Sequence, residues 1–101
     1  MSLKELKVTD EEALKVAKAL SSETAFKILR LISEEQLDIS TIARRLKLSE
    51  AYVSEAVHML EKLGLIKVSY ASGKRGIRKI CELAAGKITI VIKPEQLFIG
   101  K

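Results

Sequence analysis

The sequence predicts an α+β fold in which four helices come first and a small antiparallel sheet follows. Apolar residues recur at helical spacing in four stretches between residues 10 and 63. Beyond Gly64 the pattern changes to alternating apolar and polar residues, interrupted by a Gly-rich break typical of a hairpin. The length of 101 residues fits one domain. We expect that domain to span residues 1–101, with its core between residues 9 and 83.

Two helices are expected in the N-terminal third. The first runs over residues 10–20, with Thr9 as its N-cap and Glu12 completing a capping box. The second runs over residues 23–33. It is apolar around most of its circumference, so we expect it to be the central buried helix. Residues 1–8 are expected to fray.

A pair of helices joined by a tight turn follows. Residues 37–39 are expected to form a very short strand, and Ser40 to cap a third helix that ends at Leu46. After a turn at residues 47–48, a fourth helix is expected over residues 49–63, and Gly64 is a typical left-handed stop. Its buried stripe has i, i+3, i+4, i+7 spacing and consists of Val53, Ala56, Val57, Leu60 and Leu63.

A hairpin is expected after the fourth helix. Residues 65–70 and 77–83 read as its two strands, and the basic segment ASGKRG as its turn. Two helices joined by a tight turn and followed by a basic hairpin form the layout of a winged helix-turn-helix. The fold class is therefore four helices with a two- to three-stranded antiparallel wing sheet, and the hairpin at residues 65–83 is the wing.

The segment KITIVIK at residues 87–93 has two interpretations. It is the strongest β segment of the chain, because it is rich in β-branched residues. One interpretation makes it the third strand of the wing sheet. The other makes it a dimer element, since an exposed apolar edge is an aggregation hazard unless a second subunit covers it.

Positive charge is concentrated in the C-terminal part of the chain. Residues 1–38 hold six Lys and Arg against eight Asp and Glu, whereas residues 39–101 hold twelve against five. A polyanionic partner explains this asymmetry, and an ordinary solvated surface is the alternative. The chain has no Asn and is rich in Lys, Glu and Ile, a composition typical of thermophilic proteins, and we expect an archaeal source.

Several function classes have little support. The chain has neither a long apolar run nor a signal-peptide pattern, so we expect a cytoplasmic protein without a membrane partner. A single Cys excludes an intramolecular disulfide framework, and Cys81 is expected to be a buried thiol rather than a redox switch. One His cannot form an intrachain His cluster for a metal. No nucleophile sits beside a general base and no P-loop spacing occurs, so we expect neither an enzyme nor a cofactor, and no motif indicates a small-molecule effector.

The fourth helix is predicted to enter the DNA major groove with its N-terminal half. Ser and Tyr can bond bases or phosphates, Ala can touch a thymine methyl, and Glu can accept from cytosine. The predicted recognition residues are Ser49, Glu50, Ala51, Tyr52, Ser54, Glu55 and His58. Predicted contacts with the DNA backbone are Ser40, Thr41, Arg44, Arg45, Lys47 and Lys62. The predicted wing contacts are Lys74, Arg75 and Arg78.

Two motifs point to a family. ALSSET followed by KILRLI, and then LSEAYVSEAVHMLEKLGLI, are similar to the second helix and the recognition helix of ArsR-type winged-helix transcription regulators. The resemblance covers residues 19–83. It implies a homodimeric, mostly repressive regulator of partly palindromic operators, with N- and C-terminal elements building the dimer.

The chain departs from the ArsR pattern in three places. Metal-sensing members carry a Cys-x-Cys pair where this chain reads QLDISTI, so no metal site is expected. Glu55 and Ala56 follow Ser54, where the family often carries His or Arg. Many members end in a helix, whereas this chain ends in a predicted strand.

Two functions are therefore open. The first is sequence-specific binding of double-stranded DNA by a homodimeric transcription regulator, which we expect to be a repressor. The second is a winged-helix module that binds protein in a transcription or RNA-processing assembly. The acidic residues Glu50 and Glu55 on the outer face of the fourth helix favour the second.

Overall fold

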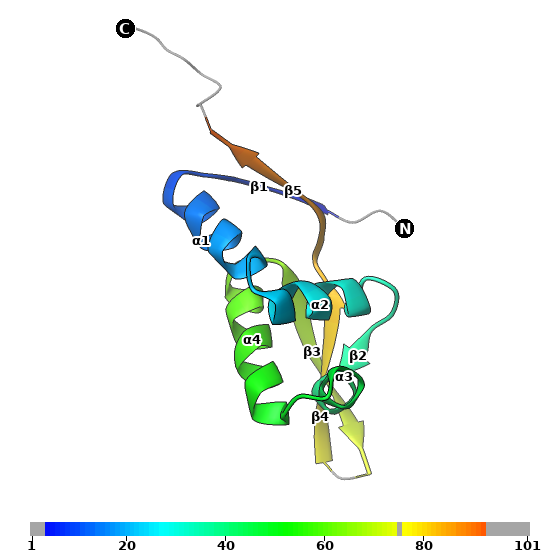
Figure 1. Cartoon of the computed structure of the whole chain (residues 1–101). Coiled ribbons are helices and arrows are strands. Elements are labelled where there is room, and N and C mark those ends of the chain that lie inside the picture. The colour runs from blue at the N-terminus through cyan, green and yellow to red at the C-terminus, as the bar shows by residue number, and fades with distance from the viewer. Residues whose placement is uncertain (1–3, 75, 93–101) are drawn as a thin grey trace, which may run out of the picture.

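The computed structural model describes residues 4–74 and 76–92. Its elements in chain order are β1 (Lys4–Thr9), α1 (Asp10–Leu20), α2 (Glu23–Ile32), β2 (Leu37–Asp38), α3 (Ile39–Leu46), α4 (Glu50–Lys62), β3 (Ile66–Gly73), β4 (Gly76–Leu83) and β5 (Ala85–Val91). In Figure 1 the helices form the middle of the molecule, the β3–β4 hairpin projects at one end, and β1 and β5 lie at the other. The predicted four helices and antiparallel wing sheet are confirmed.

The wing sheet has three strands in the order β2-β4-β3, all antiparallel. The β3–β4 register runs from Ile66 opposite Leu83 to Gly73 opposite Gly76, which leaves a two-residue loop at the tip. Gly76, the first residue after the loop, has a positive φ of 111°, a backbone conformation that glycine adopts without steric cost. The third strand is β2, so the interpretation of residues 87–93 as a wing strand is wrong.

The N-terminal segment forms a strand, and the expectation that residues 1–8 fray is wrong for Lys4–Val8. β1 pairs in parallel with β5, with Leu6 opposite Ile88 and Val8 opposite Ile90. The apolar side chains of β1 share one face because successive residues alternate across a strand. That face packs on α1, where Val8 joins Ala13 and Val16 in a small buried cluster.

The main core lies between α2, α3, α4 and the wing sheet. Its fully buried side chains are Ile28, Ile42, Val53, Val57, Leu60, Leu65 and Cys81. α4 supplies three of them at helical spacing, whereas the flanking stripe positions Ala56 and Leu63 are only half-buried. α2 supplies Ile28, Leu29 and Ile32 to the core, as expected of the central buried helix, but it is buried on one face only and leaves Phe26 49% exposed.

Turn chemistry fixes several helix ends. The Ser22 hydroxyl accepts a hydrogen bond from the Ala25 N–H at 3.2 Å and caps α2. At the end of α4, Gly64 has φ +85°, and the Leu65 N–H donates to the Leu60 carbonyl at 3.0 Å, which closes a Schellman motif.

Of two predicted N-caps, Thr9 has the predicted position but lacks the capping hydrogen bond, and Ser40 is wrong. Thr9 holds the N-cap position of α1 without a side-chain cap hydrogen bond. The chain instead reverses through Asp10, whose φ is +55°. α3 begins at Ile39, so Ser40 lies inside its first turn and Asp38 takes the N-cap position.

Leu60→Ala is expected to lower the free energy of unfolding by about 2–5 kcal/mol, because it leaves a cavity in the centre of the core. Met59→Ala, one position away on the exposed side of α4, is expected to cost about 1 kcal/mol or less. Urea unfolding at a fixed protein concentration measures both. Equal losses would contradict the orientation of α4.

Candidate nucleic-acid interface

The outer face of α4 carries the predicted recognition residues. Ser49 caps the helix, and its hydroxyl accepts a hydrogen bond from the Tyr52 N–H at 3.1 Å. Because Val53 and Val57 are fully buried, the opposite side of the helix is exposed to solvent. Glu50, Ala51, Tyr52, Glu55 and His58 are exposed, and Ser54 is half-buried.

A hollow of about 440 Å³ lies where α3, α4 and the wing meet. It is lined by Asp38, Ile39, Ser40, Glu50, Ala51, Ser54, Ile77, Arg78 and Lys79. The structure therefore brings together one or more residues from each of the three predicted groups, namely the start of α3, the first two turns of α4 and the wing. The wing residues of the hollow come from β4, which the whole of β3 separates from α4 in sequence, so the hollow is a product of the tertiary fold.

The wing strand β4 reaches the hollow by simple alternation. Residues 77, 79 and 81 share one face of the strand, and Cys81 at the base of that face is fully buried in the core. Ile77 and Lys79 continue the same face beyond the core. Ile77 is 76% exposed, and neither it nor Asp38 is among the residues predicted from sequence. The two-residue alternation of a β-strand, applied from the buried Cys81 toward the hairpin tip, is the sequence signal that would have identified Ile77.

The hollow itself is electrostatically mixed. The hydroxyl of Thr41 holds the pKa of Asp38 below its usual value, and the positive charge of Arg78 lowers that pKa further. Asp38 is therefore charged at neutral pH and lies with Glu50 opposite two cations, Arg78 and Lys79. A phosphate at the start of α3 would meet the Asp38 carboxylate, which weakens the predicted backbone role of Ser40 and Thr41.

The turn between α3 and α4 exposes further cations. Arg44 and Lys47 are exposed and make no ion pair within the described residues. Arg45 instead bonds the Glu35 carboxylate at 3.1 Å, with both side chains about half exposed. Arg45 thus ties α3 to the connector that follows α2, and it offers less charge to a polyanion than its two neighbours.

The turn holds Lys47 in an unusual backbone conformation. Lys47 has φ 60° and ψ 47°, the left-handed region that normally takes Gly at a helix end. The Leu48 N–H donates to the Ala43 carbonyl at 2.9 Å, which completes the same type of helix end as at Gly64. The left-handed conformation of Lys47 therefore lowers the free energy of unfolding by about 1 kcal/mol or more.

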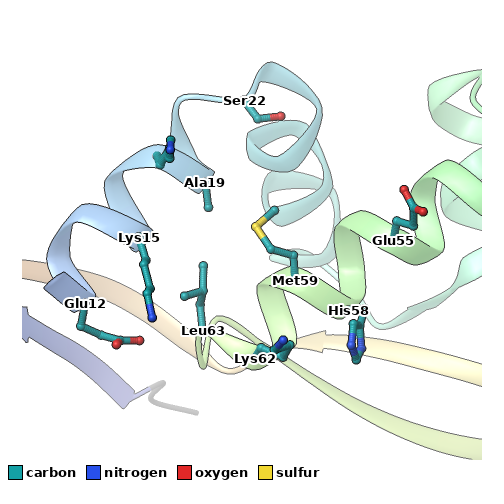
Figure 2. A pocket seen from close by; sticks show the side chains of 10 residues that line it. Glu12, Lys15, Ala19, Ser22, Glu55, His58, Met59, Lys62 and Leu63 are labelled. Carbon is teal, nitrogen blue, oxygen red and sulfur yellow. The ribbon is translucent and has the colours of Figure 1, made fainter.

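The C-terminal half of α4 lies in a different environment. Glu55, His58 and Lys62 line a second hollow, of about 570 Å³, between α4 and α1. Figure 2 shows them on α4, with Lys15 on the facing helix α1. Met59 and Leu63 line the same space with Ala19. The predicted recognition set is thus divided, since Glu55 and His58 share a hollow with α1 rather than with the wing. Lys62, a predicted backbone contact, lies in the same hollow.

The remaining candidate groups are structural. Cys81 is fully buried, and burial raises the pKa of its thiol to about 11, which confirms the predicted buried thiol. In residues 4–74 and 76–92, no three His, Cys, Asp or Glu side chains gather as a metal site would need. Within the same ranges, no helix has both the length and the apolar character needed to cross a bilayer.

Of the predicted wing contacts, Lys74 is exposed at the wing tip, and Arg75 lies outside the described residues.

Comparison with known proteins places this geometry in a known class. Residues 21–71, from the start of α2 into β3, match the MarR family. HlyU from Vibrio cholerae superposes with a TM-score of 0.64 and 21% identity, over 74% of this chain and 75% of that chain. A homodimeric winged helix-turn-helix DNA-binding domain from Mycobacterium bovis gives a TM-score of 0.64 and 21% identity, over 74% and 66%. At this level of identity the two neighbours show a shared fold.

An ArsR-like transcriptional regulator from a Rhodococcus species is more similar in sequence. It is 31% identical with a TM-score of 0.53, over 67% of this chain and 62% of that chain. No curated protein sequence matches the chain at a significant level.

Lys47→Gly is expected to raise the free energy of unfolding by roughly 0.5–1 kcal/mol, because relief of the left-handed strain exceeds the entropy cost of glycine. Arg44→Gly is the matched control, since it also removes one cation but places Gly inside α3. It is expected to lower the free energy by about 1 kcal/mol. Chemical denaturation measures both variants, and a loss of similar size in the two would contradict the assigned turn.

Proposed function

Since the chain belongs to the MarR family, we propose that it is a homodimeric, cytoplasmic repressor that binds double-stranded DNA with sequence specificity. The family is one of winged helix-turn-helix transcription regulators. The predicted ArsR-like regulator is therefore confirmed as a winged helix-turn-helix transcription regulator of the ArsR/MarR type. On the same ground the chain is not an enzyme. The dimer, the repressive role, the compartment and the contact residues are our proposal, and so is an origin in a thermophilic archaeon.

The observation that carries the proposal is the hollow between the first turns of α4 and the wing strand β4. An α-helix fits the major groove, which is about 12 Å wide. When α4 enters with its capped N-terminal end, Glu50, Ala51 and Ser54 face the base edges. The β3–β4 hairpin then extends along the neighbouring backbone, with Lys74 at its tip and Arg78 beside the hollow.

The affinity is proposed to come from the rim of the interface rather than from its centre. The hollow contains Asp38 and Glu50, whose negative charges oppose phosphate. The exposed cations Arg44 and Lys47 at the α3–α4 turn and Lys74 at the wing tip supply the sequence-independent part of binding. The acidic centre then disfavours DNA sites that do not present base-edge donors, such as the cytosine amino group, to Glu50.

A homodimer extends this interface to two half-sites. The neighbour from Mycobacterium bovis is a homodimeric DNA-binding domain. Two copies related by a two-fold axis would read half-sites about 34 Å apart, which is one turn of B-DNA. The operator is accordingly expected to be a partial palindrome.

Selection of genomic fragments by the purified chain tests the proposal. Enriched fragments that share an inverted repeat with this spacing support it. The acidic residues Asp38 and Glu50 also suit a winged-helix module that binds a basic protein segment. Absence of enrichment, together with no fluorescence-anisotropy change on random duplex at micromolar protein and low salt, would overturn DNA binding in favour of that module.

Lys74→Ala combined with Arg78→Ala is expected to weaken binding to all DNA sequences and to reduce the slope of log affinity against log salt by about 2. The physical reason is the loss of counterion release at two phosphates. Lys15→Ala combined with Lys18→Ala removes the same charge from α1, outside the proposed interface, and should leave the slope nearly unchanged. Anisotropy titrations at several salt concentrations measure both, and equal slopes in the two double variants would rule out the wing contact.

A further inference from the structure

β1 and β5 form a two-stranded parallel sheet at the end of the molecule opposite the wing tip (Figure 1). Within the described residues, each strand pairs only with the other. α1 packs against one face of this sheet. Parallel strands are normally found inside larger sheets, and a two-stranded sheet is marginal by itself. The β1–β5 sheet therefore has a free edge on each side.

The two free edges differ in chemistry. β1 carries Lys4, Glu5 and Lys7, and charged side chains protect an edge against pairing. β5 and the residue after it read ITIVI over positions 88–92, without a charge and mostly β-branched. Of its side chains, Ile90 is 39% exposed and Ile92 is 87% exposed. The unprotected edge is therefore that of β5.

We propose that β5 pairs antiparallel with β5 of a second copy, so that a continuous four-stranded sheet β1-β5-β5-β1 holds the homodimer together. This inference rests on the homodimer of the proposed function and names the surface that forms it. A two-fold axis makes an interface from the same patch on both copies, and two identical strands related by it pair antiparallel. The partner of this edge is thus a second copy of the chain.

The side chains of β5 suit such a self-complementary pairing. In a register centred on Thr89, Ile88 lies opposite Ile90 of the partner subunit, on the face that packs toward α1. Lys87 lies opposite Val91 of the partner subunit, so no like charges meet across the two-fold axis. The pairing satisfies the free backbone groups of β5 and covers its exposed isoleucine side chains.

Cysteine cross-linking of the full chain tests this register. Thr89→Cys lies on the axis, where the two Cα atoms of an antiparallel pair are about 4.5–5.5 Å apart, within reach of a disulfide. Lys87→Cys is the matched control on the same face. Its two copies would be displaced by four residues along the strands, about 14 Å, which is too far. Cys81 is buried and serves as an unreactive background thiol in both variants.

Mild oxidation should convert most of the Thr89→Cys protein into a species of twice the 11.2 kDa chain mass on a non-reducing gel. The Lys87→Cys variant and the parent chain should stay at the single mass. Circular dichroism of the reduced variants confirms that each is folded before oxidation.

Sedimentation of the parent chain separates this inference from the proposed function. A dimer by sedimentation in which Thr89→Cys does not cross-link, or cross-links no better than Lys87→Cys, overturns the β5 interface and leaves the homodimer standing. A chain that sediments as a monomer overturns both the interface and the homodimer. DNA binding is measured independently of either.

Discussion

The packing of α4 against α2, α3 and the wing sheet is the interaction on which the rest of the structure depends. Val53, Val57 and Leu60 have no exposed surface, and they lie in one cluster with Ile28 and Ile42. Burial of this stripe sets the rotation of α4 about its own axis, because an apolar stripe can face the core in only one orientation. The rotation in turn decides which side chains face outward beside the wing. Leu65, which follows Gly64 directly, is also fully buried and holds the start of the wing to the same core.

The two ends of the molecule differ in chemistry. At one end, α3, α4 and β4 line a hollow in which acidic and basic groups are mixed, and further exposed cations lie at the α3–α4 turn and at the wing tip. At the other end, β1 and β5 form a sheet that lacks charge on the β5 edge from Ile88 onward. The first end suits a charged, grooved ligand such as duplex DNA, and the second suits another copy of the chain. α1 joins the two, since it packs on the β1–β5 sheet and also lines the hollow beside the C-terminal half of α4.

The local patterns of the sequence predict most of the body of the fold. The bounds of α1 are met, and those of α2 and α4 lie within one residue of the expected ones. α3 begins two residues earlier than the predicted cap at Ser40 implies. β1 is missed because its pairing with β5 joins segments about eighty residues apart, and a short stretch with two apolar residues gives no local sign of a distant partner. For the interface, periodicity predicts that the residues of 49–58 outside the apolar stripe face outward. It cannot predict that His58 and Lys62 line a hollow with α1, or that Ile77 and Ser54 line one hollow, because both depend on how the helices and the wing pack.

The most direct test of the division between the two ends is a titration of the isotope-labelled chain with a short random DNA duplex, followed by amide chemical shifts. The account predicts that amide chemical shifts change at the start of α3, in the first turns of α4 and along the β3–β4 hairpin. The amide chemical shifts of β1 and β5 are predicted to stay unchanged. Changes concentrated in α1, β1 and β5, with α4 and the hairpin unaffected, would contradict it.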